Sequence, residues 1–518
     1  MKKRILSAVL AGIMTLSLAA CAAPGAAAPA AAPAGSDAAE APAASGELVH
    51  VKQLMSNFGN NTDDAAEVNA AINEIANQYG LDVEIEFVSS DAYAQQLNLM
   101  IAGGEDLDVF MVTPGASSFA TLSANNSLAD IAPYLDTAAP DLKALIRQEY
   151  WDACTLDGRT LLVTTWDDKV TGNWLVMDKT ILDELGLEEQ ARAIASYDDI
   201  TAIYEKVYAA HPELSMVAAG GSSNALTPSE IFFGDTFAEN TLYDTLGDQA
   251  YQMGAIYEGT EEVINVFETP EWKKNCERMQ AWYDAGYVYK DSVTTTDSGE
   301  TLLKNGAIFS FFTNAEMNCE TAKTSQCGKP VVAVKVGEVP VSGGRIRQFG
   351  YGVSSTSKHP DAAVKWLQLL YTNADVANLL AYGIEGKHYV TNEDGSLSYP
   401  EGVTMDNCGY QYHVAFVVGN YYLLKIWEGD SLTLREDAKA VNETAEVSKY
   451  ANFSWDNSAV TAEVTATTNV YNKYYKNITV GACDVDAEIE KFNEELHASG
   501  LDEIMAAKQE QLNAFLGK

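Results

Sequence analysis

The sequence has few basic residues and few histidines for its length. Among 518 residues there are 33 Lys and Arg against 73 Asp and Glu, which gives a net charge of −40 at pH 7. A surface of this sign repels nucleic acids and anionic lipids, and we expect no nucleic acid among the partners. The six histidines are scattered, so we expect no transition-metal site. Asn392-Glu393-Asp394-Gly395 lacks the twelve-residue calcium pattern and predicts an Asp-Gly hairpin turn instead.

The motifs of common enzyme classes are also missing. There is no G-x-x-x-x-G-K-[ST], no H-E-x-x-H and no G-x-S-x-G. Ser355-Thr356-Ser357-Lys358 matches the S-x-x-K of some acyl-transfer enzymes, but the companion S-D-N and K-T-G motifs are absent. The same segment precedes Pro360 and a predicted helix, where Ser and Pro are typical starting residues. We therefore predict a protein that is not an enzyme, with no catalytic residue and no cofactor.

The seven cysteines show no C-x-x-C spacing, which argues against zinc and redox sites. An exported protein can form disulfides, and Cys319 and Cys327 are the closest pair. The wide scatter of the other cysteines favours buried free thiols. Both alternatives remain open at this stage.

After the first twenty residues, no stretch is long and apolar enough to resemble a membrane span. The start itself reads as a secretory signal: Met1-Lys2-Lys3-Arg4 is charged, and Ile5 to Ala20 is almost entirely apolar. Leu18-Ala19-Ala20-Cys21 resembles the lipobox of bacterial lipoproteins. That resemblance implies acylation of Cys21 and a chain held by lipid at the extracellular face of the cell membrane.

A flexible tether is predicted next. Residues 21–46 contain almost only Ala and Pro after the cysteine, with no large apolar side chain to bury. The remaining chain, 47–518, is too long for one ordinary core, so two lobes are expected. No Gly/Ser linker separates them, which suggests that the chain crosses between the lobes more than once.

The folded part opens with a β-α-β-α-β pattern. Strands are predicted at 48–55, 83–87 and 108–113, with helices near 62–79 and 91–102. This order is typical of a parallel sheet covered by helices, in which ligands gather at the carboxyl ends of the strands. The loops at 56–61 and 113–117 should therefore face one cleft.

Further helices and strands are expected along the chain. The predicted helices are 180–187, 197–211, 270–286, 361–372, 375–382, 459–475 and a last one from 484, broken at Gly500. The predicted strands are 175–177, 307–312, 331–336 and 351–354.

Aromatic residues are plentiful, with 26 Tyr, 16 Phe and 8 Trp. Flat rings suit the C–H faces of sugars, while neighbouring Asp, Glu and Asn suit the hydroxyls. Aromatics next to polar residues in predicted loops are therefore the best ligand candidates. These are Phe58 beside Asn57, Trp166 beside Asp167-Asp168, and Trp455 beside Asp456-Asn457.

Several stretches resemble the extracellular family 1 solute-binding lipoproteins of ABC sugar importers. The first stretch consists of Gly350-Tyr351-Gly352-Val353, Ser357–Ala363 and Trp366-Leu367, and it is similar to the family's segment near the hinge between the lobes. The second stretch is Asn173–Lys179, at the position where such proteins first cross between the lobes. Tyr382–Tyr389 and Tyr399–Gly402 look like the LplA-type subgroup of Gram-positive lipoproteins, and the tail from Phe453 to Leu516 resembles its additional region, DUF3502.

The resemblance implies an α/β, two-lobed, periplasmic-binding-protein-like fold of type II with lobes joined by hinge strands. The expected division is a signal peptide at 1–20 and a tether at 21–46. The first lobe would comprise 47–172 and about 346–414, and the second about 173–345 and 415–518. The implied function is capture of a carbohydrate, expected to be an oligosaccharide, by lobe closure and its delivery to the permease subunits of an ABC importer. A monomer is expected.

The resemblance also implies a set of ligand contacts. Stacking is assigned to Phe58, Trp166, Trp174 and Trp455, and hydroxyl recognition to Asn57, Asp168 and Glu385. Thr113, Tyr351, Phe233 and Trp427 complete the set. In its Gly-Ile-Glu-Gly turn, Glu385 has the alternative role of holding a backbone corner.

Three rival functions stay open: a peptide receptor, a surface glycoside hydrolase that uses a carboxylate pair, and an adhesive lipoprotein. A charged sugar such as a uronate would need a basic residue in the cleft. Arg345 and Arg347, just before the hinge-side Gly350-Tyr351, are the first candidates.

Overall fold

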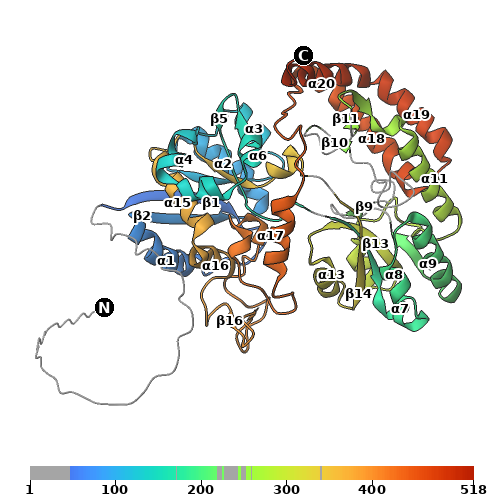
Figure 1. Cartoon of the computed structure of the whole chain (residues 1–518), viewed down its shortest axis with the longest axis horizontal. Coiled ribbons are helices and arrows are strands. Elements are labelled where there is room, and N and C mark those ends of the chain that lie inside the picture. Colours follow the sequence, from blue (N-terminus) through green and yellow to red (C-terminus); the bar gives the residue numbers. More distant parts are fainter. Residues whose placement is uncertain are drawn as a thin grey trace, which may run out of the picture. The chain divides into compact units, whose positions relative to one another are not determined.

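The computed structural model describes residues 47–170, 172–218, 225–226, 243–244, 246, 253–257, 260–338 and 341–518. The signal, the tether with Cys21, and Phe233 lie outside these ranges. Two five-stranded sheets organise the described chain, each with its own apolar core (Figure 1). This confirms the α/β, two-lobed fold.

The first sheet has the strand order β2-β1-β3-β15-β6. Its strands are β1 (Val49–Ser56), β2 (Leu81–Val88), β3 (Val109–Val112), β6 (Val163–Thr164) and β15 (Gly350–Val353). Strands β1, β2 and β3 are parallel, whereas β15 runs antiparallel to β3 and β6. Apolar side chains on both faces of β1 and β3 are buried because helices cover the sheet. The predicted β-α-β-α-β order is confirmed.

Helices and short turns surround this sheet. The helices are α1 (Ala65–Ala76), α2 (Ser90–Gly103), α3 (Phe119–Ala124), α4 (Ala132–Ala138), α5 (Pro140–Leu145), α6 (Gln148–Ala153), α14 (Gly343–Ile346), α15 (Pro360–Thr372), α16 (Ala374–Tyr382) and α17 (Leu434–Thr444). The 3-10 turns are η1 (Asn77–Tyr79), η4 (Ala415–Val417) and η5 (Tyr421–Leu423). Two small hairpins pair β4 (Thr155–Leu156) with β5 (Arg159–Thr160), and β16 (Val390–Thr391) with β17 (Leu397–Ser398). The latter confirms the predicted turn at Asp394-Gly395.

The second sheet has the order β14-β7-β13-β8, with β9 also paired to β13. Its strands are β7 (Gly172–Asp178), β8 (Ser215–Ala218), β9 (Ala225–Leu226), β13 (Ile308–Ala315) and β14 (Val331–Glu338). The helices of this part are α7 (Lys179–Leu185), α8 (Glu188–Arg192), α9 (Tyr197–Ala210), α12 (Gly299–Lys304) and α13 (Cys319–Cys327).

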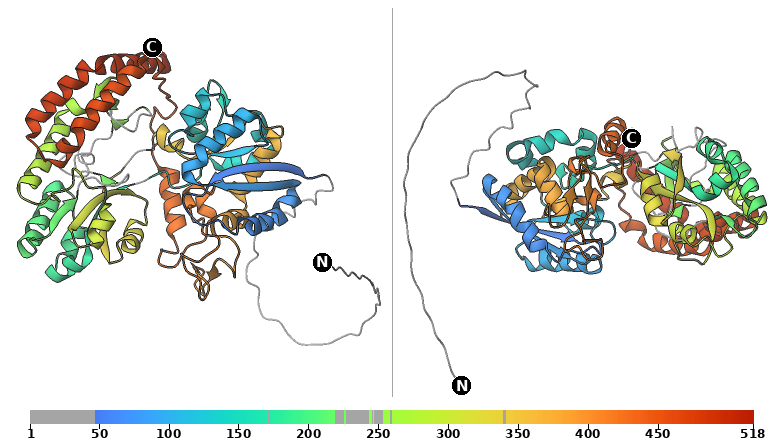
Figure 2. Two further views of the ribbon diagram at one scale, coloured as in Figure 1. Left: turned by 180° about the vertical axis from the view of Figure 1, so that it is seen from behind. Right: turned by 90° about the horizontal axis from the view of Figure 1, so that it is seen from below.

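A helical layer completes the second lobe. In it α11 (Pro270–Asp284), α18 (Thr461–Val480), α19 (Val485–Ala498) and α20 (Leu501–Phe515) pack side by side (Figures 1 and 2). A small sheet of β10 (Tyr243–Asp244), β11 (Met253–Tyr257) and β12 (Val263–Asn265) adjoins α20, with the turns η3 (Val266–Glu268) and η6 (Ser458–Val460). Phe267, Trp272 and Phe492 are buried in its core. The predicted C-terminal helices and their break at Gly500 are confirmed.

Within the described residues, the chain passes between the two lobes three times: after Val170, between β14 and Val341, and after Ala451. We expected the first lobe to end near 414. Instead Val417, Val418 and Ala451 belong to the core of the first lobe. Segment η5 stays there because the side chain of Asn378 in α16 binds the main chain at Leu423 and Lys425. Segment α17 stays there because the side-chain oxygen of Asn442 accepts from the Tyr150 hydroxyl and the Lys169 main-chain N–H. We therefore move the proposed boundary from 415 to about 452.

The six cysteines of the folded part are free thiols, and all but Cys483 are buried. Cys319 and Cys327 lie at the two ends of α13. Eight residues of helix separate Cα atoms by about 12 Å, which is too far for a disulfide. Ser357 of the S-x-x-K match donates its hydroxyl hydrogen to Asp108 Oδ1 at 2.5 Å and accepts from the His359 N–H, so it acts as a turn residue.

Candidate functional site

Three phenylalanines meet at the carboxyl end of β1. Phe58 follows β1, Phe349 precedes β15, and Phe416 lies in η4. The ring centroids are 6.5 Å apart for Phe58 and Phe349, 5.9 Å for Phe58 and Phe416, and 4.9 Å for Phe349 and Phe416. All three side chains are half-buried. We call this group the aromatic cluster; it leaves apolar ring surface where ligands of such sheets gather.

The loop after β1 holds Phe58 in a strained backbone conformation. Its φ is +51°, a region that non-glycine residues occupy only at a cost of about 1–3 kcal/mol. Ser56 Oγ accepts from the Phe58 N–H, and Asn57 Oδ1 accepts from the Gly59 N–H at 2.9 Å. The Asn60 side chain donates to the carbonyl of Tyr412. These bonds fix the position of the ring, and strain of this kind is typical of functional loops.

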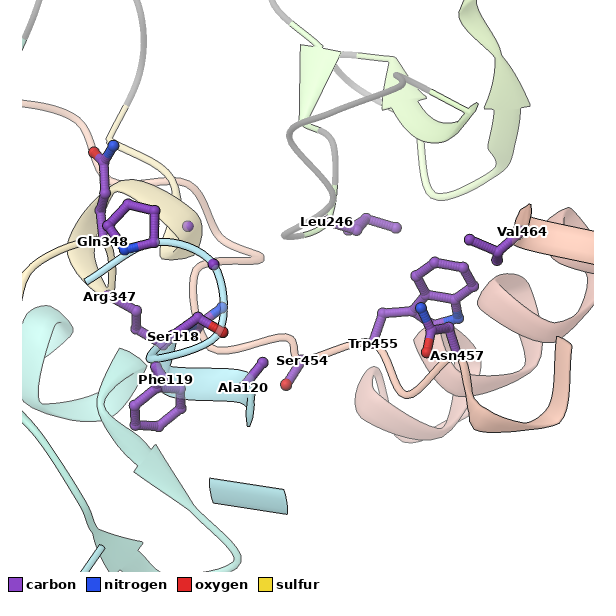
Figure 3. A pocket seen from close by; sticks show the side chains of 13 residues that line it. Ser118, Phe119, Ala120, Leu246, Arg347, Gln348, Ser454, Trp455, Asn457 and Val464 are labelled. Carbon is purple, nitrogen blue, oxygen red and sulfur yellow. The ribbon is translucent and has the colours of Figure 1, made fainter. Parts of the chain in front are cut away.

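A cavity of about 520 Å³ is lined by residues of both lobes (Figure 3). We call it the Trp455 cavity. Its wall includes the loop after β3, at Pro114, Gly115 and Ser118, and the residues Arg347 and Gln348 that follow α14. Opposite them, Figure 3 shows Trp455 beside Asn457 and Val464. Gln348 lines the cavity and is next in sequence to Phe349, whereas the three phenylalanines themselves are not among the lining residues.

The two arginines expected near the hinge are already bonded to main-chain carbonyls. Arg347 Nη1 donates to Ala153 and Ala451, and its Nη2 donates to Phe453. Arg345 donates to the carbonyls of Asp168 and Lys169. Arg347 is the single charged residue among the described residues that line the Trp455 cavity. These arginines therefore stabilise the lobe crossings, and the cavity wall consists mainly of apolar and small polar groups.

The first crossing contains a buried charged cluster. Lys169 Nζ lies 2.5 Å from Asp167 Oδ1, and both side chains are almost fully buried. The neighbouring Asp168 is 1% exposed, and its Oδ1 accepts from the Val170 N–H. Burial, with the charges of Glu316 and Asp167, raises the pKa of Asp168 to about 7. The Asp168 carboxyl in the hinge therefore gains or loses its proton near pH 7.

The structure places some of the predicted ligand residues together and others apart. Phe58 and Asn57 lie at the aromatic cluster, and Trp455 lies in the Trp455 cavity. Thr113 is half-buried and begins the loop that lines the cavity, with its hydroxyl 2.6 Å from that of Ser117. Asn57 uses its side-chain oxygen within its own turn. We keep these four residues in the proposed site.

Other predicted residues have structural partners instead. Tyr351 is fully buried, and its hydroxyl donates to the carbonyl of Val417. The Trp174 indole donates to the carbonyl of Ala315 at 3.0 Å. Glu385 is exposed and accepts from Thr391 at 2.6 Å, which fits its alternative role as a corner residue. Trp427 packs against the ring of His413, with centroids 4.5 Å apart.

Trp166 and Asp168 lie in the buried hinge crossing, away from the lining of the Trp455 cavity. Sequence reasoning missed Phe349, Phe416 and Gln348. A signal for Phe349 was available, because it directly precedes the hinge-side Gly350-Tyr351. Phe416 follows an aromatic run at Tyr410 and Tyr412, but nothing in the sequence indicated that it meets Phe58.

Within the described ranges, no helix is long and apolar enough to cross a membrane. Nor does that part of the chain contain a group of three or more His, Cys, Asp or Glu residues arranged to hold a metal ion.

Known proteins resemble this chain along most of its length. The profile of a family described as "Bacterial extracellular solute-binding protein" matches residues 70–393, and that of the domain of unknown function DUF3502 matches residues 449–517. A carbohydrate ABC transporter substrate-binding protein of Streptococcus pneumoniae is 22% identical over 482 residues, which make up 92% of each chain.

Solved structures share the fold. The N-glycan transport solute-binding protein NgtS of Streptococcus pneumoniae has a TM-score of 0.76 at 19% identity, over 90% of this chain and 99% of NgtS. A solute-binding protein of Bifidobacterium longum infantis, described as binding HMO, has a TM-score of 0.58 at 15% identity, over 91% of this chain and 99% of its own.

Proposed function

Because the chain belongs to the family of bacterial extracellular solute-binding proteins, we propose that it is the receptor of an ABC importer that binds a carbohydrate. The proposed ligand is an oligosaccharide, which the protein delivers to the membrane permease without changing it chemically. The S. pneumoniae relative is named for carbohydrate, and NgtS has also been solved with Man1GlcNAc. These names support the ligand class without identifying the sugar.

The aromatic cluster is the observation that carries this proposal. Phe58, Phe349 and Phe416 lie half-buried at the carboxyl end of β1, and Gln348, next in sequence to Phe349, lines a cavity large enough for a small molecule. Apolar ring faces pack well against the C–H faces of a sugar. The nearby Gln348, Ser118 and Asn457 supply groups that can bond to hydroxyls.

Lobe closure is the proposed mode of capture. The Trp455 cavity is lined from both lobes, so a ligand there contacts both of them. Such a ligand favours the conformation in which both sets of contacts form, and this shifts the population toward that conformation. Arg347, which ties three main-chain carbonyls together, would hold the crossings while the lobes move.

We further propose that Cys21 is acylated and that the protein is a monomer held at the extracellular face of the cell membrane of a Gram-positive-type bacterium. The lipobox-like Leu18-Ala19-Ala20-Cys21 and the Ala/Pro tether support this proposal. Labelling of cells with a radioactive or clickable palmitate tests it. Incorporation that is lost in Cys21→Ser supports the anchor, and equal labelling of both proteins contradicts it.

Calorimetry with a panel of neutral oligosaccharides tests the ligand class. We expect at least one sugar to bind saturably, and Phe58→Ala and Phe416→Ala each to weaken that binding by about tenfold or more. Phe515→Ala, which removes a 41% exposed ring in α20, is the matched control and should leave the Kd unchanged. Binding of a peptide panel in place of any sugar would make the protein a peptide receptor, and turnover of a glycan would make it a hydrolase.

A further inference from the structure

A second cavity, of about 300 Å³, lies between the hinge crossing and the segment η5–α17 of the first lobe. We call it the Trp166 cavity. Its lining residues are Leu145, Trp166, Asn420, Tyr422, Leu423, Arg435, Glu436 and Lys439. None of them lines the Trp455 cavity or belongs to the aromatic cluster. The site proposed for sugar therefore does not account for this cavity.

Three hydrogen-bond donors in this lining are buried and have no acceptor within the protein. They are Trp166 Nε1, the hydroxyl of Tyr422 and Arg435 Nε. The Trp166 side chain is only 2% exposed. A buried donor without an acceptor costs about 1–3 kcal/mol, and native proteins seldom tolerate several of them together. Three in one lining indicate that the acceptor is supplied from outside the chain.

The protein holds these donors in fixed positions. The main-chain N–H of Trp166 donates to the carbonyl of Gly419, and the main-chain carbonyl of Trp166 accepts from the Tyr421 N–H at 2.9 Å. The indole ring packs against Tyr150 and Tyr422, with centroids 5.7 and 6.1 Å away. The Arg435 guanidinium lies over the ring of Tyr421 at 3.8 Å. Fixed donors bind an acceptor with little loss of conformational entropy.

The charges of the lining favour an anion. Arg435 and Lys439 lie one turn apart on α17, and Glu436 is the one acid among the described lining residues. Lys439 also lies 3.7 Å from Glu443 of the same helix, so Arg435 is the main positive charge of the lining. The side chain of Asn420 is already used, because it donates to the carbonyl of Tyr371 and accepts from the Tyr422 N–H. Two acids act on Tyr422: Asp167 is paired with Lys169, and burial raises the pKa of Asp168 to about 7, so that Asp168 holds its proton and carries no charge below that pH. A net positive lining stands out in a chain whose net charge is −40.

We propose that the Trp166 cavity binds a small oxyanion (a carboxylate, a phosphate or a sulfate) through Trp166 Nε1, the Tyr422 hydroxyl and Arg435. An oxyanion offers several acceptor atoms and needs no acceptor in return, which matches a wall whose unpaired groups are donors. A sugar hydroxyl both donates and accepts, so it fits this wall less well. The site lies within one lobe and the hinge, and it is independent of the function proposed for the other cavity.

Calorimetry of the full-length protein tests the site with inorganic phosphate, sulfate and acetate as probes, at constant ionic strength set by NaCl. We expect one saturable site for at least one probe. Trp166→Phe keeps a ring but removes the Nε1–H, and Tyr422→Phe removes the hydroxyl; each should weaken binding about tenfold. Trp272→Phe removes an equally buried and unpaired indole N–H in α11 and should leave the Kd unchanged.

The preferred probe identifies the ligand chemistry: phosphate or sulfate indicates a tetrahedral anion, and acetate indicates a carboxylate. Thermal melting and sugar binding of each variant show whether it has folded. The proposal is overturned if no probe binds saturably to the wild-type protein. It is equally overturned if Trp166→Phe and Tyr422→Phe fold and bind as tightly as Trp272→Phe, or if a crystal structure with the probe shows only water in the cavity.

Discussion

The ammonium group of Lys169 lies 2.5 Å from the carboxylate of Asp167 inside the first hinge crossing, where the two side chains are 1% and 4% exposed. Lys169 also donates to the hydroxyl of Thr165, which is itself bonded to Asp167. This closed network lies in the segment about which the lobes are proposed to move. A buried pair of this kind is costly to break, since either partner left alone is an uncompensated charge.

We predict that Lys169→Met destabilises the protein by about 3–5 kcal/mol, because it leaves Asp167 buried and unpaired. Urea unfolding monitored by circular dichroism measures this loss. Lys473→Met is the matched control: Lys473 pairs with Glu495 at the surface, and its loss should cost at most about 1 kcal/mol. Equal losses in the free energy of unfolding for the two substitutions would show that the buried pair in the hinge stabilises the protein no more than a surface pair does.

Asp168 should make the protein less stable as the pH rises. Its pKa is raised to about 7 in the folded state, against 3.8 for the ordinary carboxyl, so the folded protein holds this proton more tightly than the unfolded chain does. The stability contributed by the protonated form is complete below pH 3.8 and is lost as the pH rises toward 7. Asp168→Asn should therefore gain stability relative to wild type between pH 5 and 8. A difference that does not vary with pH would rule out this explanation.

His413 should have the opposite dependence. Burial lowers its pKa from 6.5 to about 4, so the unfolded chain takes up a proton that the folded protein resists. Stability is then complete above pH 6.5 and falls as the pH drops toward 4. His413→Asn tests this, because asparagine tolerates the φ of +42° at this position. Between pH 6.5 and 4, the melting temperature of the variant should fall less steeply with decreasing pH than that of the wild type. An equal fall in both proteins would contradict the assignment.

Tyr351→Phe separates a core role from a ligand role. The variant loses the hydrogen bond to the carbonyl of Val417 inside the core, which should cost about 1–2 kcal/mol of stability. Its sugar affinity should remain within about twofold of wild type, since the ring stays in place. A large loss of affinity in a folded variant would return Tyr351 to the ligand site.

Local patterns predicted the fold well because the signals lie close together in the sequence. The alternating apolar residues before Phe58 and the helix that follows are enough to indicate a strand whose loop faces a ligand. The aromatic cluster was harder to predict, since Phe58 meets partners that lie about 290 and 360 residues away in the chain. No periodicity encodes contacts of that separation.

The misplaced lobe boundary has a similar cause. Segments η4 and η5 lie in the apolar run Val414–Trp427, whose composition does not indicate the lobe against which it packs, and bonds made by Asn378 and burial of Val417 place them in the first lobe. Segment α17 joins the first lobe through bonds from Tyr150 and Lys169 to the side chain of Asn442. Tyr351 illustrates why ligand contacts are hard to predict from sequence. An aromatic residue near a hinge can be a core residue, and its burial is seen only in the structure.

A crystal structure of the protein with an oligosaccharide that binds in calorimetry tests the central claim most directly. The account predicts a sugar ring packed against Phe58, Phe349 or Phe416, with the rest of the ligand extending into the Trp455 cavity. A sugar bound elsewhere, with the aromatic cluster free, would contradict it.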